Sequence, residues 1–430
     1  MIGERRFGPF FLTQFLGAFN DNVFKNALLL LIAFHAADRY AVSSNVLINL
    51  SAGLFILPFF LFSATAGQLA DKFEKSMLIR LVKLLEIVIM LAAAAALWFD
   101  ELLLLIFLLF MMGLQSALFG PVKYGLMPQI LTDDELLGGN GLVESGTFLS
   151  ILLGTALGGV LISVDPWGRE LVAGAVVLIA SMGFASSLWI PRIAAVAPDM
   201  RIDWNLFRET WSILGHARAN RSVFLCIVGI SWFWFVGSVY LTQLPNFTLL
   251  YLGGNEEVVT LLLTLFSIGV AAGSLLCERL SGRHIDIGLV PFGAIGLTIF
   301  GLDLAFMPPQ DGTPGLLGVA GWLDAGAAPR VILDIVLLGT FGGFYIVPLY
   351  ASVQQRSDPA HRCRIIAANN VMNALLMVCA ALLAIVMLGI GFAIAELFLV
   401  VALLNILMGA YIFLKEPEFI RRFVAWIKSR

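Results

Sequence analysis

Long apolar stretches recur along the whole chain, separated by short segments that carry charges or turn residues. Most reach about 20 residues, the length that an α-helix needs to cross the hydrocarbon core of a bilayer. The pattern therefore predicts an all-α integral membrane protein with twelve transmembrane helices. Their expected ranges are 9–33, 46–70, 77–98, 102–122, 141–163, 171–190, 223–250, 258–277, 286–307, 330–352, 365–388 and 391–414.

Polar segments divide this run of helices into parts. Residues 1–190 hold the first six helices and residues 222–414 hold the second six, and a linker rich in arginine, 191–221, joins them. The linker contains RIDWNLFRETWSIL, whose apolar spacing predicts a helix along the membrane surface. Residues 415–430 form a basic amphipathic tail, expected either to lie on anionic lipid or to dock a partner protein.

The two sets of helices resemble each other. The segment after the second helix reads GQLADKFEKSMLIR, and the segment after the eighth reads GSLLCERLSGRH. Both place an acid before a base, Asp71 with Lys72 and Glu278 with Arg279. Because internal repeats mark many secondary transporters, we expect two pseudo-symmetric six-helix halves.

Composition and charge support a membrane protein and give its expected orientation. The chain is 60% hydrophobic and 13% charged, with a mean hydropathy of +0.94, which excludes a soluble globular protein. Of its 26 lysines and arginines, 22 fall on one side of the predicted topology. Only Arg39, Arg169 and Arg330 fall on the other side, and Lys25 lies inside the first helix. Since positive charge stays on the cytoplasmic side, both termini are predicted to be cytoplasmic.

The sequence gives no sign of catalytic or cofactor chemistry. It contains no GxxxxGK[ST] loop for ATP, no CxxC pair, and no histidine that begins the H-x-x-x-x-D pattern of acyltransferases. We therefore expect a secondary transporter with no enzymatic activity, cofactor, metal or nucleic-acid partner. A membrane-embedded acyltransferase is the disfavoured alternative from another class.

The first helix carries an unusual polar face. Its polar side chains fall within an arc of about 140° at 100° per residue, together with Phe7, Phe11 and Phe15. These polar residues are Gln14, Asp21, Asn22, Lys25 and Asn26. Asp21 and Lys25 are four residues apart, so they can pair along the helix, either as part of a substrate path or as a purely structural pair. A face of charges, amides and phenyl rings suits an amphiphile better than a sugar.

Three further residues are candidate substrate contacts. Lys123 follows Pro121 in FGPVKYG, where the proline is expected to end the helix, and it either reaches an anionic phosphate or only marks the cytoplasmic side. Trp234 and Gln243 lie in ISWFWFVGSVYLTQLPNF, which offers aromatic surface and hydrogen-bonding groups for a ligand or for packing.

The fifth helix is expected to have a structural role. Asn140 is predicted to cap its first turn, where Glu144 would complement the helix dipole. Gly154, Gly158 and Gly159 are spaced for close packing against another helix. By analogy, Asn369 or Asn370 is expected to open the eleventh helix.

The segment after the second helix resembles the loop signature G-x-x-x-D-[RK]-x-G-[RK] of the major facilitator superfamily. Gly67, Asp71, Lys72 and Lys75 match it, while Glu74 stands where the signature has glycine. A charged hairpin of this kind can cap a neighbouring helix and hold one face of a transporter shut. The predicted gating residues are therefore Gly67, Asp71 and Lys72, with Glu278 and Arg279 in the second half; the alternative is a loop that only fixes topology.

Three motifs in order, QFLGAFNDN, GPVKYG and NGLVES, resemble the bacterial lysophospholipid transporter branch of that superfamily. The resemblance implies a major facilitator fold in the bacterial inner membrane. It also implies that a lysophospholipid, chiefly lysophosphatidylethanolamine, is flipped to the cytoplasmic leaflet for re-acylation, with Asp21 and Lys123 as cavity charges.

The resemblance has one departure and leaves one alternative. Standalone members carry an arginine on helix seven, where this chain has Leu241 or Gln243. The SWFWF stretch instead resembles the transporter half of fusions with an acyltransferase and an acyl carrier protein synthetase, which implies such a protein as a separate cytoplasmic partner. The alternative function is a proton-coupled exporter of drugs or small metabolites, with Asp21 as the titrating group.

Overall fold

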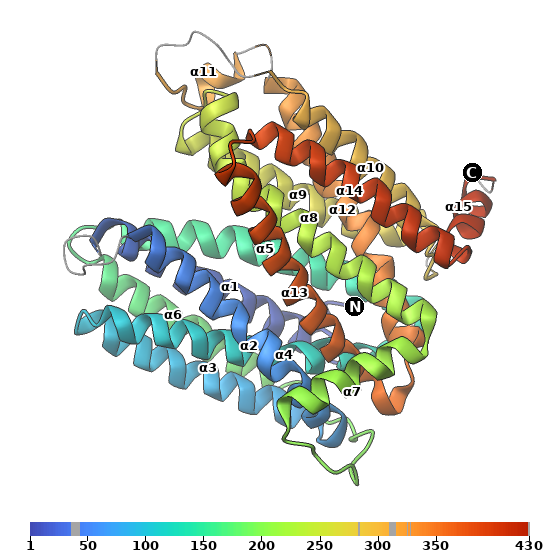
Figure 1. Ribbon diagram of the computed structural model, residues 1–430. Helices are drawn as coiled ribbons and strands as arrows, with labels where there is room; N and C mark the ends of the chain where they lie inside the picture. The colour runs from blue at the N-terminus through green and yellow to red at the C-terminus, as the bar shows by residue number, and fades with distance from the viewer. Residues whose placement is uncertain (36–43, 283, 309–314, 325, 327, 429–430) are drawn as a thin grey trace. The chain divides into compact units, whose positions relative to one another are not determined.

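The computed structural model describes residues 1–35, 44–282, 284–308, 315–324, 326 and 328–428, and its regular elements are helices (Figure 1). Three bases in the charge count, Arg39, Arg283 and Arg430, lie outside these residues. The helices are α1 (Gly8–His35), α2 (Ser44–Lys72), α3 (Lys75–Trp98), α4 (Leu102–Ile130), α5 (Asp133–Ile162), α6 (Gly168–Ser187), α7 (Leu206–Ala219), α8 (Arg221–Tyr251), α9 (Glu256–Leu280), α10 (Leu289–Ala305), α11 (Val319–Leu323), α12 (Ala328–Arg356), α13 (Arg362–Gly389), α14 (Ile394–Lys415) and α15 (Glu418–Lys428).

Ten helices in the described part of the chain are long and apolar enough to cross a membrane. They do not include α1, whose polar face lowers its hydropathy, or α10, which has 17 residues. The all-α membrane architecture is confirmed, and the count of twelve spans stays a prediction.

Two predicted helix ends are wrong. Helix α4 does not stop near residue 122 but continues through Pro121 to Ile130, and α5 begins at Asp133 instead of residue 141. Inside a bilayer, a helix that ends leaves backbone groups without partners, so losing one hydrogen bond at a proline costs less than stopping. Lys123 consequently lies within α4, not in a loop.

The asparagines predicted to open helices lie inside them. Asn140 is two turns into α5, where its side chain bonds to Leu136 O at 2.8 Å and exchanges hydrogen bonds with Gln354 at 2.6 and 3.1 Å. Glu144 is therefore not in the first turn. Asn369 and Asn370 likewise lie well inside α13, because that helix begins at Arg362.

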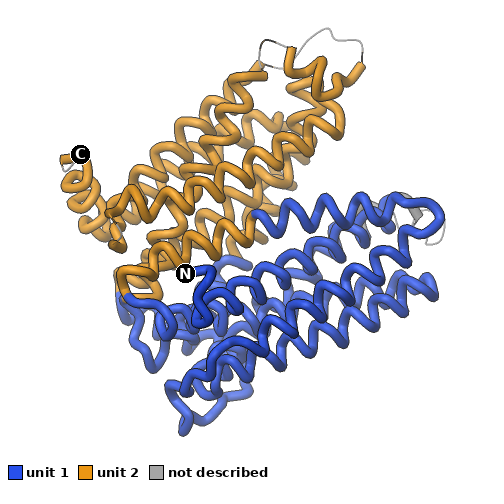
Figure 2. The backbone as a smooth tube through the Cα atoms, turned by 180° about the vertical axis from the view of Figure 1, so that it is seen from behind, with its two compact units in different colours: residues 1–132, 149–220, 356–374 blue, residues 133–148, 221–355, 375–430 orange. Residues whose placement is uncertain are grey.

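The chain divides into two compact units (Figure 2). Unit 1 comprises residues 1–132, 149–220 and 356–374, and unit 2 comprises residues 133–148, 221–355 and 375–430. The linker ends where the chain passes from unit 1 to unit 2. Helices α5 and α13 each contribute to both units: the start of α5 belongs to unit 2, and the start of α13 belongs to unit 1.

The core of unit 1 is formed by apolar faces of α1, α2, α3, α4 and α6. Helix α5 approaches α1 through glycines, as expected: a Cβ at Gly154 would lie 2.5 Å from Phe19 O, and one at Gly158 would lie 2.5 Å from Val23 O. This close approach brings the backbone of α5 against the polar face of α1.

In unit 2, a buried amide ties three helices together. Asn405 on α14 accepts a hydrogen bond from Trp232 Nε1 on α8 at 2.8 Å and donates to Ala294 O and Thr298 Oγ1 on α10 at 3.0 and 2.9 Å. Because Asn405, Trp232 and Ala294 are buried and Thr298 is half-buried, their mutual bonds orient the three helices.

The predicted linker helix is α7, which packs against α2 in unit 1. Asn205 caps it by accepting from Arg208 N at 3.0 Å, and Glu209, Ile213 and Ala217 form its buried face. The linker is also held by Gln68 of α2, which exchanges hydrogen bonds with the backbone of Asp203 at 2.9 and 2.7 Å.

Candidate substrate-binding and gating sites

The charged residues of α1 contact neighbouring helices of unit 1. Asp21 Oδ2 accepts a hydrogen bond from Ser116 Oγ on α4 at 2.7 Å. Lys25 Nζ lies 5.4 Å from the centre of the Phe55 ring on α2. Asp21 and Lys25 thus attract each other along α1, while each also contacts a neighbouring helix, Asp21 through a hydroxyl and Lys25 through a cation–π contact.

Two of the other predicted residues of this face are more deeply placed. Asn22 is buried and donates to Ala18 O at 2.7 Å, one turn earlier on its own helix, and Gln14 is also buried. Asn26 donates to Thr155 O on α5 at 2.8 Å. Asp21 and Lys25 are half-buried, as is Asn26.

The aromatic part of the face forms a continuous column. Phe7, Phe11, Phe15 and Phe19 follow one another at i, i+4 spacing, with successive ring centres 6.1, 6.3 and 6.2 Å apart. The column and Asp21 lie on one helix, so α1 carries both an apolar wall and a charged side chain.

A buried ion pair of unit 1 was missed by the sequence analysis. Lys83 Nζ lies 2.6 Å from Glu86 Oε2 on the same helix, α3, and both side chains are at most 1% exposed. Glu86 also accepts from Asn20 Nδ2 on α1 and Gln115 Nε2 on α4, each at 3.0 Å. The sequence analysis counted Lys83 among the bases of the cytoplasmic side, near the start of the helix expected at 77–98, and in the structure it lies two turns inside α3, which begins at Lys75.

This pair connects to Asp21 through α4. The side-chain amide of Gln115 donates to Glu86, so the Gln115 Oε1 atom faces Ser116 Oγ at 3.3 Å. Ser116 Oγ in turn donates to Asp21. Glu86, Gln115, Ser116 and Asp21 thus form one polar chain, which we call the α3–α4–α1 network. The i, i+3 spacing of Lys83 and Glu86 was a sequence signal for the ion pair, but not for the contacts of Gln115 and Ser116.

Lys123 lies two turns beyond Ser116 on α4. Its side chain is 9% exposed, and Nζ lies 4.9 Å from the centre of the Tyr124 ring. It lies within α4, two turns before that helix ends at Ile130, so both of its interpretations, as a phosphate contact and as a marker of the cytoplasmic side, stay predictions.

The two predicted contacts from the second half lie on α8 in unit 2. Trp234 stacks on Phe148 with ring centres 6.2 Å apart and planes at 9°, and its Nε1 donates to Tyr350 Oη at 3.3 Å. Gln243 is half-buried. The structure thus places Trp234 in an aromatic cluster with a polar edge.

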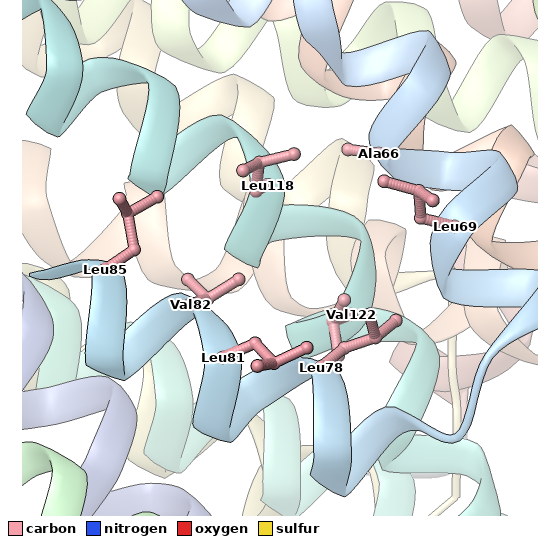
Figure 3. A pocket seen from close by; sticks show the side chains of 8 residues that line it. All are labelled: Ala66, Leu69, Leu78, Leu81, Val82, Leu85, Leu118 and Val122. Carbon is pink, nitrogen blue, oxygen red and sulfur yellow. The ribbon is translucent and has the colours of Figure 1, made fainter.

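An apolar groove lies between α2, α3 and α4 of unit 1 (Figure 3). Eight side chains line it: Ala66, Leu69, Leu78, Leu81, Val82, Leu85, Leu118 and Val122. Its lining is wholly apolar, so it suits hydrocarbon and not a charged group. Val122 precedes Lys123, but the predicted polar contacts are not among the lining residues.

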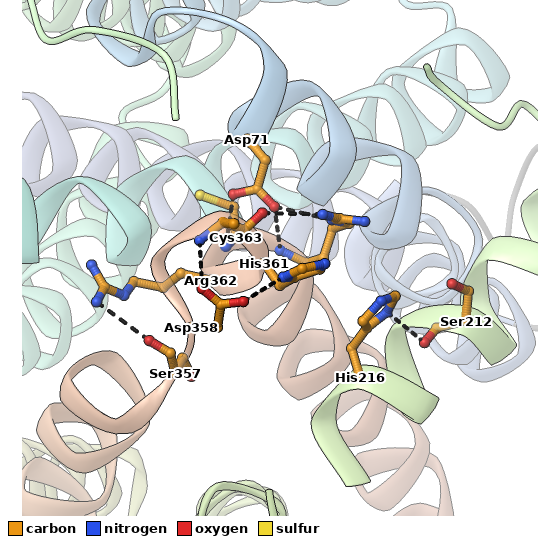
Figure 4. Close-up of polar contacts among 10 residues, drawn as sticks. Asp71, Ser212, His216, Ser357, Asp358, His361, Arg362 and Cys363 are labelled. Atoms are coloured by element: carbon orange, nitrogen blue, oxygen red, sulfur yellow. Dashed lines mark hydrogen bonds and ion pairs between the residues drawn. The ribbon is translucent and has the colours of Figure 1, made fainter. Parts of the chain in front are cut away.

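The predicted gating residue Asp71 caps α13 within unit 1 (Figure 4). Its carboxylate is fully buried at the end of α2. It accepts from the backbone N–H groups of Cys363 and Arg364 at 3.1 and 3.4 Å and from Arg364 Nε at 3.2 Å. An acid at a helix N-terminus satisfies unpaired N–H groups and complements the helix dipole.

Gly67 permits this contact. A Cβ at Gly67 would lie 2.8 Å from the Cβ of Ala367 and 2.9 Å from the Cα of Arg364, so a larger residue would push α2 away from α13. Lys72 instead lies over Phe73, with Nζ 5.8 Å from the ring centre. Arg364, which the sequence analysis did not single out, is the ionic partner of Asp71.

The second predicted gate lies in unit 2. Glu278, near the end of α9, packs against α5, where a Cβ at Gly138 would lie 2.6 Å from Glu278 Oε2. Arg279 is exposed. The acid of each repeat therefore meets the early part of a helix, α13 for Asp71 and α5 for Glu278.

Glu74, the departure from the loop signature, caps α3. Its carboxylate accepts from Ser76 N, Met77 N and Ile193 N at 2.8, 2.9 and 3.0 Å. Partial burial alone would raise the pKa of Glu74, but these N–H groups and the Ser76 hydroxyl hold it below its ordinary value. A glycine could not tie the start of α3 to the linker in this way.

Two histidines join α7 to the segment before α13 (Figure 4). The rings of His216 and His361 stack with centres 4.7 Å apart, and His361 Nδ1 lies 2.8 Å from Asp358 Oδ2. Burial, with the positive charges of Arg364 and His361, lowers the pKa of His216. The N–H of Ala360 and the His361 contact lower the pKa of Asp358, which favours its carboxylate form.

Sequence comparison identifies the family of the chain. Residues 10–329 match the sequence family described as the Major Facilitator Superfamily. The chain belongs to the major facilitator superfamily. Within the described residues, no group of three or more His, Cys, Asp or Glu side chains is arranged to hold a metal ion.

Curated relatives within the superfamily cover most of the chain. The protein named lysophospholipid transporter LplT from Klebsiella pneumoniae subsp. pneumoniae is 29% identical over 348 residues, which are 80% of this chain and 78% of the relative. LplT from Escherichia fergusonii is 28% identical over 350 residues, which are 80% of this chain and 79% of the relative. Both relatives are named as transporters.

Solved structures of major facilitator transporters share the fold. FucP, in the outward conformation, superposes with a TM-score of 0.71 at 14% identity and covers 95% of this chain and 98% of its own. The proton:xylose symporter XylE gives a TM-score of 0.71 at 13% identity, with 95% and 94% coverage. The predicted major facilitator fold is confirmed.

Proposed function

We propose that this multi-pass membrane protein is a secondary transporter that flips a lysophospholipid to the cytoplasmic leaflet of the bacterial inner membrane. The polar and aromatic face of α1 carries the proposal, because it offers charges and an apolar wall on one element. The names of the Klebsiella and Escherichia relatives support the same class of substrate.

The chemistry of a lysophosphatidylethanolamine matches the charges of unit 1. Its headgroup carries a phosphate and an ammonium group, and its single acyl chain is apolar. We propose that Asp21 binds the ammonium, that Lys123 and Lys25 attract the phosphate, and that the phenylalanine column of α1 contacts the acyl chain. Gln14, Asn22, Trp234 and Gln243 are proposed as further contacts.

We further propose that the loop acids act as gates during alternating access. The bonds from Asp71 to the start of α13 hold that helix against α2, and breaking them would free it. Gly67 and Lys72 belong to the same gate, and Glu278 and Arg279 form its counterpart in unit 2.

The distribution of basic residues supports cytoplasmic termini. When Lys83 and Lys123 are left out, because each lies about two turns inside a spanning helix, 20 lysines and arginines still fall on one side of the proposed topology against three on the other. This asymmetry supports a cytoplasmic position for the proposed Asp71 gate. A separate cytoplasmic acyltransferase that re-acylates the product remains part of the proposal.

A flipping assay tests the proposed roles. Asp21→Asn and Lys123→Ala are each expected to abolish flipping of lysophosphatidylethanolamine in proteoliposomes while leaving expression and thermal unfolding unchanged. Asp199→Asn and Lys415→Ala, at exposed positions, are matched controls that should flip at the wild-type rate. Wild-type flipping by the first two variants would return both charges to a structural role.

A further inference from the structure

The C-terminal helix α15 docks on unit 2 through one side of its apolar face. It follows the spanning helix α14 after only Glu416 and Pro417. Phe419 is fully buried, with its ring centre 5.7 Å from that of Phe413. Trp426 Nε1 donates to Leu280 O at 2.8 Å, and its ring centre lies 5.4 Å from that of Phe292 on α10.

The other side of the apolar face is open. Ile420, Val424 and Ile427 recur at i, i+4 and i+7, so they form one strip along α15. They are 40, 43 and 53% exposed, whereas Phe419 on the docked side is fully buried. The 11-residue helix α15 thus packs one half of its apolar face against unit 2 and leaves the other half exposed.

Basic side chains border the open strip. Arg421 and Lys428 are exposed and follow Val424 around the helix axis. The acid of α15, Glu418, lies beyond them, paired with Arg422 at 3.8 Å. The strip is therefore flanked by positive charge that faces away from unit 2.

We propose that α15 lies in the interface of an anionic leaflet, with Ile420, Val424 and Ile427 among the upper acyl chains and Arg421 and Lys428 at the phosphates. The bilayer that α14 crosses begins next to α15, because two residues separate these helices. An amphipathic helix with a basic rim binds such an interface through apolar burial and attraction to anionic headgroups. This proposal depends on the membrane-spanning fold and is independent of the transported substrate.

Site-specific fluorescence tests the proposal in the full chain. In a Cys379→Ser background, where the remaining cysteines are buried, single cysteines replace Ile420, Val424 or Ala425 and are labelled with bimane. Ala425 is exposed on the polar side and serves as the matched control. The variants are reconstituted in phosphatidylcholine vesicles with phosphatidylglycerol, and quenching by a lipid nitroxide near the headgroup is compared with quenching by aqueous iodide.

We expect the nitroxide to quench labels at 420 and 424 at least about twofold more than the label at 425, and iodide to show the opposite order. Replacing both Arg421 and Lys428 with glutamine, or omitting phosphatidylglycerol, should weaken the nitroxide quenching. Equal nitroxide quenching at the three sites, or iodide quenching alone at 420 and 424, would overturn the proposal and indicate a surface for another protein. An Ile427→Cys label replaces either strip position if that variant fails to fold.

Discussion

At the scale of single residues, the Lys83–Glu86 pair explains how unit 1 holds charge within its core. Removing either charge from water is costly, and only a partner at short range with further hydrogen bonds offsets that penalty. Glu86 has these partners in Asn20 and Gln115. The pair also orients the Gln115 amide, because its N–H donates to Glu86. The Gln115 oxygen is therefore the atom that faces Ser116, the partner of Asp21.

Breaking this pair on one side is predicted to destabilise the protein more than removing both charges. Glu86→Gln leaves Lys83 buried without its counter-charge, which costs on the order of 3 to 5 kcal/mol. The double variant Lys83→Met with Glu86→Gln leaves no buried charge and should recover most of that loss. Thermal unfolding in detergent measures both, and equal melting temperatures for the single and double variants would contradict the interpretation.

Some of these residues were visible in the sequence and others were not. Asp21, Lys25 and the phenylalanines lie on one predicted helix, so the period of 3.6 residues was enough to group them. Ser116, Gln115 and Asn20 carry no such signal, because their roles depend on contacts between α1, α3 and α4. Lys83 was expected within the third helix, but its burial against Glu86 was not predicted because it depends on the packing of α1 and α4 around α3.

At the scale of elements, acids set the starts of two helices in unit 1, α3 and α13. Glu74 caps α3 and accepts from backbone N–H groups of the first turn of α3 and of Ile193. Asp71 caps α13 and accepts from the backbone N–H of Cys363. These two caps fix the ends of three helices around one loop, which makes the loop a structural junction as well as a candidate gate.

The Glu74 cap gives a prediction with a defined pH dependence. Glu74→Ala should lower the free energy of unfolding by about 1 kcal/mol at neutral pH. Because the folded protein lowers the pKa of Glu74, this contribution is complete above the ordinary pKa of the carboxyl and is lost as the pH falls through the lowered value. The difference in thermal unfolding between wild type and Glu74→Ala should therefore shrink in acid.

Glu101 supplies the control for this cap. It occupies the same position at the start of α4 but makes no capping bond with its side chain. Glu101→Ala should change unfolding little at any pH. Equal effects of the two substitutions, or a Glu74 effect that grows on acidification, would argue against the cap.

The Asp71 cap predicts how exposed the start of α13 becomes. In a variant that keeps Cys363 as its sole cysteine, Asp71→Ala should raise the rate at which a water-soluble maleimide labels that thiol. We expect about a tenfold increase, because losing a charged cap costs on the order of 1 to 2 kcal/mol. Lys72→Gln is the matched control, since Lys72 lies over Phe73 instead of on α13. An unchanged labelling rate in Asp71→Ala would show that the cap does not hold the helix.

Most helix positions followed from hydropathy alone, within four residues of the ends observed. The exceptions are the end of α4 and the start of α5. There, the local sequences at Pro121 and GGNG are typical of a break between helices, but both lie inside a helix. Local propensity was overruled there because burial in apolar surroundings favours unbroken backbone hydrogen bonding.

At the scale of the whole molecule, each compact unit contains a helix segment from the other half of the sequence. The start of α5 belongs to unit 2 and the start of α13 to unit 1. Sequence repeats predicted two similar halves but could not predict this exchange, which depends on packing between residues such as Asp71 and Arg364 that lie 293 positions apart. Each acid of the repeated loop signature contacts one of these exchanged segments.

Transport of a lysophospholipid is the central claim, and flipping by the purified wild-type protein tests it most directly. Labelled lysophosphatidylethanolamine is placed in the outer leaflet of proteoliposomes, and its extraction by albumin is followed over time. We predict a protein-dependent loss of extractable lipid that is absent from protein-free vesicles. If the lipid stays extractable while the same vesicles transport a cationic dye, the protein is an exporter of small molecules and the claim is wrong.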